Sequence, residues 1–181
     1  MTDIVKDWRV ELIRDYPDLF HPLPGDPPTA EGWPCVGDGW ADLLQRACVR
    51  ILTAVQADGG SFRFTEIKEK YATLRAYWEG SLSPEADAMV EEAIDLAEAR
   101  SACTCEICGE VGQLHGPGWL TTRCAAHAEG RRPVEIRPGF ENIHIEERFV
   151  RDRRVVRCRR YDRETDSFID VDPASLGIQE T

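Results

Sequence analysis

The spacing of the cysteines constrains the fold of this chain more than any other feature. Four of the seven cysteines fall within 22 residues, and clustering of an odd number of cysteines is atypical of a secreted disulfide framework. A Cys-x2-Cys pair is followed, after fifteen residues, by a Cys-x2-His pair, and the four residues are Cys105, Cys108, Cys124 and His127. Three thiolates and one imidazole form a donor set that suits structural zinc in a tetrahedral site. The pattern therefore predicts one bound zinc ion and a reducing compartment.

The residues between the two pairs support a zinc-finger fold. Gly109 permits the tight knuckle in which backbone amides hydrogen-bond thiolate sulfur. Residues 111–123 contain two short β-prone pieces around His-Gly-Pro-Gly, which predicts a hairpin. Cys124 and His127 both face a metal if they occupy the first turn of a helix. Knuckle, hairpin and helix start together resemble a treble-clef zinc finger.

Two further residues of this segment are weaker ligand candidates. Cys103 is separated from Cys105 by one residue, and this spacing does not close a knuckle. His115 lies at the predicted hairpin tip, where we expect an exposed turn residue.

A wider stretch, of about residues 36–130, resembles a loosely defined family of small phage-borne and bacterial proteins without assigned activity. The motifs that carry the resemblance are IKEKYATLRAYW, AEARS, CEICG and GWLTTRCAAHA. The resemblance implies that a helix, the hairpin and the finger form one unit, and it implies no chemistry beyond the four metal ligands. Ala72 stands where the hairpin of the family has a glycine, which leaves the tightness of that turn open.

Hydrophobic periodicity predicts two helices within residues 3–56, separated by a loop. The first is expected over residues 3–20, with Pro17 at its end, and the Pro- and Gly-rich residues 21–39 are expected to form the loop. The second spans residues 40–56, where the helical spacing is clearest, and Asp38 is its expected N-cap. The apolar face of the first helix includes Ile4, Val5, Trp8 and Leu12. That of the second includes Cys48, which is expected in the core.

Residues 61–80 predict two strands joined by a turn near residues 71–73, with a helix over 65–78 as the alternative. Ser83 and Pro84 open a further helix that runs to about Arg100. A three-stranded antiparallel meander with one polar face is predicted over residues 143–171, followed by a frayed tail after Pro173.

The expected fold class is therefore α+β. It comprises a helical and hairpin region over residues 1–102, the finger over 103–132 and the meander over 133–173, in one compact unit.

Charge is distributed unevenly along the chain. The formal net charge is −11, but residues 131–163 contain 11 arginines and 6 acidic residues. This Arg-rich strip offers Arg153, Arg157, Arg159 and Tyr161 as a binding surface for phosphates and stacked bases. The favoured interpretation is that the arginines pair with the acidic helices of the same chain, because the rest of the chain is strongly acidic. A nucleic acid and a protein partner remain as alternatives.

Four protein ligands leave zinc no position for a reacting water, so we predict a non-catalytic binding protein of phage or mobile-element type that acts through a protein partner. One alternative is a nucleic-acid-binding protein that uses residues 131–163. Another is a metal-dependent nuclease, with His115 or His144 as the base and Glu141 or Asn142 nearby. His144 is expected on a solvated strand face. No apolar run suits a membrane span and no signal peptide is evident, so we expect a cytoplasmic protein.

Overall fold

The computed structural model describes residues 7–151 and 153–178. Within these residues the chain forms four helices and nine strands in three small sheets, so the predicted α+β class is confirmed. No helix of the described part is long and apolar enough to cross a membrane. The helices are α1 (Trp8–Asp15), α2 (Pro17–Phe20), α3 (Ala41–Asp58) and α4 (Pro84–Ser101).

The three sheets have three strands each, and consecutive strands form most of the pairs. The order is β1-β2-β3 in the first sheet, β5-β4-β6 in the second and β7-β8-β9 in the third. The strands are β1 (Pro34–Cys35), β2 (Ser61–Lys70), β3 (Thr73–Ser81), β4 (Gln113–Gly116), β5 (Thr121–Arg123), β6 (Arg132–Pro133), β7 (Ile143–Val150), β8 (Arg153–Asp162) and β9 (Ser167–Val171).

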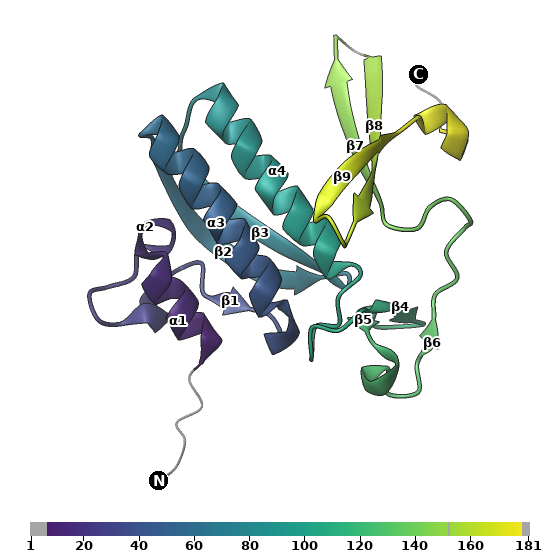
Figure 1. Ribbon diagram of the computed structural model, residues 1–181, viewed down its shortest axis with the longest axis horizontal. Helices are drawn as coiled ribbons and strands as arrows, with labels where there is room; N and C mark the ends of the chain where they lie inside the picture. Colours follow the sequence, from purple (N-terminus) through teal and green to yellow (C-terminus); the bar gives the residue numbers. More distant parts are fainter. Residues whose placement is uncertain (1–6, 152, 179–181) are drawn as a thin grey trace.

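The main core lies where α3 and α4 pack against one face of the β2–β3 hairpin (Figure 1). α3 forms where the periodicity predicts it, and Gly59 ends it in the left-handed conformation at φ +75°. Cys48 is buried in this core, as expected. The predicted N-cap is wrong, because Trp40 occupies that position without a side-chain bond. The carboxylate of Asp38 instead accepts a hydrogen bond from the Trp8 indole at 2.8 Å.

The first predicted helix is divided into α1 and α2 at Tyr16. Pro17 has no backbone N–H and disfavours a helical conformation in the residue before it, so the chain bends at this point. Leu19 and Phe20 of α2 are nevertheless fully buried. Ile4 and Val5 lie outside the described residues.

The β2–β3 hairpin confirms the strand prediction for residues 61–80, and the helical alternative is wrong. Two residues form its turn, Tyr71 and Ala72, and both have positive φ, of 53° and 69°. The turn is therefore tight even without a glycine. The Ala72 amide donates to the Glu69 carboxylate at 2.6 Å, and the Ala72 carbonyl accepts from the Thr122 hydroxyl at 2.8 Å.

α4 begins and ends close to the predicted positions and leads the chain into the cysteine segment. The Ser83 hydroxyl accepts the amide of Ala86 at 3.3 Å, which confirms the predicted cap. At the other end, the Leu74 amide donates to the Ser101 hydroxyl at 2.8 Å, so α4 is bound directly to the start of β3.

The C-terminal meander forms as predicted, but both faces of β8 are covered. Tyr161 packs with Leu96 and Ala99 of α4, whereas Val156 and Cys158 pack on the opposite side. The expected fraying after Pro173 is wrong for the described residues. A 3-10 turn over Pro173–Leu176 places the buried Leu176 side chain in one cluster with Val156 and Cys158. The proposed division into three regions stays a prediction.

Candidate metal centre

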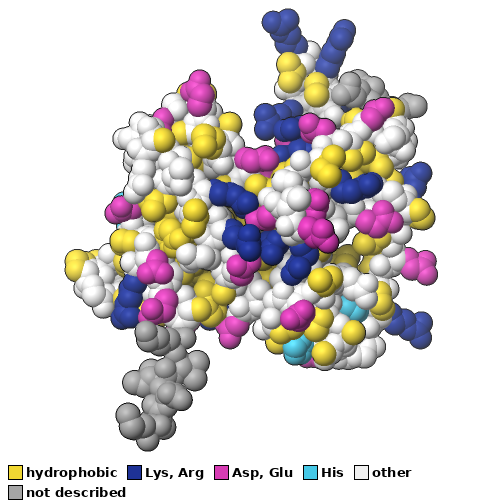
Figure 2. Space-filling view, in the orientation of Figure 1, with side chains coloured by type: hydrophobic (Ala, Val, Ile, Leu, Met, Phe, Trp, Pro, Cys, Tyr) yellow, Lys and Arg dark blue, Asp and Glu magenta, His cyan; other side chains and the backbone are white. Residues whose placement is uncertain are grey.

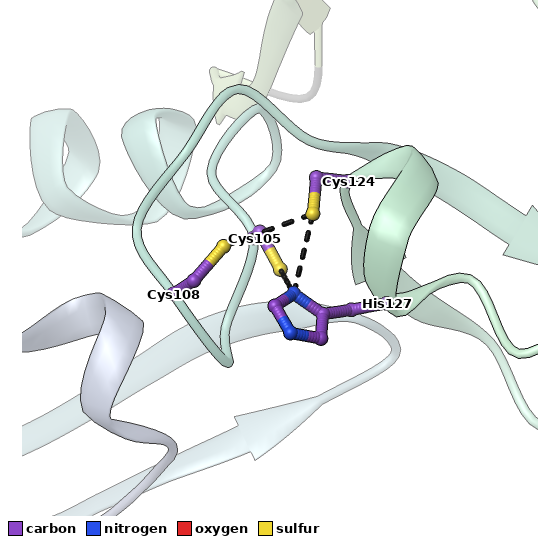
Figure 3. Close-up of side chains that lie close together, drawn as sticks. All are labelled: Cys105, Cys108, Cys124 and His127. Carbon is purple, nitrogen blue, oxygen red and sulfur yellow. Dashed lines mark hydrogen bonds between the residues drawn. The ribbon is translucent and has the colours of Figure 1, made fainter.

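The loop after α4 brings the four predicted ligands together. Cys105 and Cys108 lie on the knuckle, and Cys124 and His127 lie at the two ends of the 3-10 turn that follows β5 (Figure 3). Gly109, at φ +79°, lets the chain reverse here, and its amide donates to the Cys105 carbonyl at 2.8 Å.

The distances between the donor atoms fit a tetrahedral metal site. The Sγ atoms of Cys108 and Cys124 are 3.7 Å apart, and His127 Nδ1 lies 3.6 Å from Cys105 Sγ and 3.2 Å from Cys124 Sγ. Zinc–ligand bonds of about 2.0–2.3 Å in a tetrahedron place neighbouring donors about 3.5–3.8 Å apart. All four donor atoms lie within 4.8 Å of one another, so the cluster could hold one metal ion.

The electrostatics of the knuckle favour the thiolate form of Cys105, the buried cysteine of the Cys-x2-Cys pair. Burial raises the pKa of the Cys105 thiol, but the backbone amides of Cys124, Cys108 and Ile107 outweigh it and lower the pKa to about 6. Cys105 is therefore mostly ionised at neutral pH, which is the form that binds metal. The pKa of Cys108 is raised: the Glu110 amide lowers it, but burial and the sulfurs of Cys105 and Cys124 outweigh that effect.

A segment that the sequence analysis missed supports the knuckle from outside. The Gly39 amide donates to the Glu106 carbonyl at 2.8 Å, and the Trp40 indole donates to the Thr104 carbonyl at 2.9 Å. A Cβ atom on Gly39 would overlap the carbonyl of Cys105 and the amide of Gly109. The only available signal was the Gly-Asp-Gly-Trp run before α3, which looked like an ordinary loop.

The finger differs from the predicted arrangement at its end. The knuckle and the β4–β5 hairpin form, but Ala125–His127 is a single 3-10 turn and no α-helix follows it in the described residues. The predicted helix start is therefore wrong, and the treble-clef assignment stays a prediction.

The two weaker ligand candidates lie away from the donor cluster. His115 lies in β4, the central strand of its sheet, and its side chain is buried, so its prediction as an exposed turn residue is wrong. The Cys103 thiol is buried and contacts the Arg100 carbonyl at 3.3 Å. Burial raises the pKa of Cys103.

With this geometry established, the chain was compared with known proteins. No protein-family model, curated protein or solved structure matches it. The resemblance to small phage-borne and bacterial proteins therefore stays a prediction.

A second cluster of ionisable side chains joins α4 to the meander. Asp95, His144 and Glu146 offer three ligand-type atoms within 4.8 Å of one another. The guanidinium of Arg159 lies among them, 2.7 Å from Asp95 and in contact with Glu146 and Glu92. Since Arg159 already pairs with these carboxylates, the cluster fits an ion-pair network better than a metal site.

His144 belongs to this network and is not on a solvated face. Its Nε2 lies 3.6 Å from the Asp95 carboxylate, and this interaction raises the pKa of His144 despite partial burial. Partial burial raises the pKa of Asp95, but His144 and Arg159 outweigh it, so the net direction is downward.

The predicted Arg-rich binding surface is only partly exposed. Arg153 and Arg157 are exposed, whereas Arg159 and Tyr161 are buried. Strand alternation placed Arg157, Arg159 and Tyr161 on one face, but α4 covers the C-terminal half of that face. Arg159 and Tyr161 therefore do not form the expected surface.

The remaining charges support intramolecular pairing. Tyr161 donates to Asp166 at 2.6 Å, Arg50 donates to the same carboxylate at 2.8 Å, and Arg157 pairs with Asp170 at 3.1 Å. Figure 2 shows basic and acidic side chains lying beside one another over the middle of the molecule.

Proposed function

We propose that this chain is a non-catalytic, zinc-stabilised binding protein that acts through a protein partner. The Cys105, Cys108, Cys124 and His127 cluster carries the proposal, because its four donors complete a tetrahedral sphere. A catalytic zinc site keeps a position for water or substrate, and four protein ligands leave none. Zinc would therefore hold together the knuckle and the β4–β5 hairpin.

The charges favour a protein over a nucleic acid as the partner. A chain of net charge −11 is repelled by a polyanion. Arg159, one of the residues predicted to bind phosphates, already pairs with Glu92, Asp95 and Glu146. The nuclease alternative loses support because His115 is buried in β4 and His144 pairs with Asp95.

The cellular setting belongs to the same proposal. A cluster of thiolate ligands requires reduced cysteines, which fits the cytoplasm. The assignment to a phage or mobile-element type rests on the sequence motifs alone.

Metal analysis tests the zinc site. We expect one zinc ion per purified chain, lost in Cys124→Ser and kept in Cys35→Ser, which removes an exposed thiol outside the cluster. Structural zinc binds with about 10–16 kcal/mol, comparable to the stability of a whole domain. Cys124→Ser or a chelator should therefore lower the melting temperature. A wild-type protein without zinc, or an unchanged melting curve for Cys124→Ser, would contradict the proposal.

Affinity capture from the source cells tests the partner. We expect the wild-type chain to retain a protein that Cys124→Ser does not retain, and nuclease treatment should leave the complex intact. Retention of nucleic acid in its place, or hydrolysis of DNA or RNA by the zinc-loaded chain, would contradict a non-catalytic protein-binding function.

A further inference from the structure

An exposed aromatic cleft lies between the turn of the β2–β3 hairpin and the loop that joins β4 to β5. Tyr71 on the first segment is 71% exposed, and Trp119 on the second is 70% exposed. The cleft measures about 400 Å³, and its lining is completed by Glu69, Lys70, Gly118 and Leu120. The two segments are almost 50 residues apart in sequence and line one cleft.

The two walls of the cleft are held at a defined separation. The Thr122 hydroxyl of β5 donates to the Ala72 carbonyl at 2.8 Å, which joins the finger to the hairpin turn. The guanidinium of Arg131 donates to the Trp119 carbonyl and restrains the other wall. Thr122 lies two residues before Cys124, one of the four candidate metal ligands.

The conformation of the turn is unfavourable in isolation. Tyr71 adopts φ +53°, a left-handed conformation that suits Asn or Gly and that bulky side chains rarely adopt. The side chain gains little from burial here, because most of it faces solvent. Strained backbone of this kind concentrates at functional sites. Neither the conformation of the turn nor packing in the core therefore explains a tyrosine at position 71.

The chemistry of the cleft suits an extended peptide. Tyr and Trp rings form the walls of grooves that bind polyproline II segments, whose backbone carbonyls have no internal partners. The Trp119 indole N–H and the Tyr71 hydroxyl lie on exposed side chains, where such carbonyls can reach them.

The charges around the cleft select among occupants. The lining carries one carboxylate, Glu69, and one ammonium, Lys70, so it offers no track of cations for a phosphate backbone. The net charge of −11 attracts a basic segment and repels a nucleic acid. We infer that the Tyr71–Trp119 cleft binds a basic, proline-rich, extended segment of the protein partner. This inference rests on the proposed function, since it names the part of the partner that is recognised.

A cellulose-bound array of decapeptides, probed with the zinc-loaded full chain, tests the inference. We expect peptides with prolines and flanking Arg or Lys to be retained over matched peptides in which alanine replaces proline. The best peptide is then measured in solution by fluorescence anisotropy. Trp119→Ala and Tyr71→Ala should each weaken its binding at least tenfold. Phe149→Ala, which removes an equally exposed aromatic side chain from β7, should leave it unchanged.

Zinc content and melting temperature verify that each variant is folded. No preference for proline, or equal binding by wild type and Trp119→Ala, would overturn the inference. So would binding of a labelled (dT)20 strand that both cleft variants abolish, because the cleft would then be a stacking platform for bases. A zinc-free wild-type chain contradicts the proposed function, whereas a zinc-loaded chain without the peptide preference contradicts only this inference.

Discussion

Replacing Arg159 by Met should destabilise the chain more than any other single change in the Arg-rich strip. The Arg159 side chain is buried between β8 and α4, where it pairs with the carboxylates of Glu92, Asp95 and Glu146. Its guanidinium carbon also lies 3.9 Å from the centre of the Phe168 ring. Methionine keeps most of the volume and removes the charge, so the variant isolates the electrostatic contribution.

The magnitude follows from the exposure of the carboxylates that lose their partner. Breaking a fully buried ion pair costs about 3–5 kcal/mol, because the remaining charge is left without compensation. The Glu92 side chain is 46% exposed and can be solvated, whereas those of Asp95 and Glu146 are only 25% and 17% exposed. We therefore expect a loss near the lower limit, about 3 kcal/mol. For a chain of this size that corresponds to a fall in melting temperature of about 6–12 °C.

Urea unfolding followed by tryptophan fluorescence measures this loss, with Arg157→Met as the matched control. Arg157 lies on the same strand as Arg159 and pairs with Asp170 of β9, but both side chains are largely exposed, and such pairs contribute about 0–1 kcal/mol. If Arg159→Met stays within about 1 kcal/mol of wild type, or if Arg157→Met is equally destabilising, the meander does not dock through this network.

Three further variants test other parts of the structure. The pKa of His144 lies above its ordinary value of 6.5, so its pairing with Asp95 adds stability below that pH and loses it as the pH rises through the raised pKa. The urea midpoint of wild type should therefore fall relative to His144→Gln between pH 6 and 8, and a constant difference would refute this. Trp40→Phe leaves the buried Thr104 carbonyl without its donor, and calorimetry should show a loss of about 1–3 kcal/mol; no loss would mean that this bond does not anchor the knuckle. Tyr71→Asn suits the left-handed turn and should raise the melting temperature by about 1–4 °C, whereas a lower value would show that the tyrosine is structural.

The parts of the fold that depend on residues close together in the sequence were predictable from the sequence. The apolar spacing of α3, the Ser83 cap of α4 and the alternation in the two hairpins are local signals, and the structure has these elements close to the expected bounds. The grouping of the four metal ligands also follows from local spacing, because each pair lies within one turn of the chain.

The errors arise where distant segments decide the environment of a side chain. Alternation along β8 cannot reveal that α4 covers Arg159 and Tyr161, since that depends on how the meander docks. His115 looked exposed because Gly-Pro-Gly follows it, but it belongs to the central strand of its sheet and its side chain is buried. Asp38 has the chemistry of a cap, yet Trp8 and Arg9 bind its carboxylate.

The close approach of Gly39 to the knuckle has a consequence for reading sequence variation around this metal centre. The three atoms that a side chain at this position would strike belong to Cys105, Cys108 and Gly109. Main chain therefore contacts main chain at the back of the site, and any residue larger than glycine would displace two of the four ligands at once. In a survey of tolerated substitutions, position 39 would look as restricted as a ligand although it carries no functional group. A restriction to glycine at this position would then reflect the short distance between two backbone segments, and it would not indicate a catalytic or binding role for residue 39.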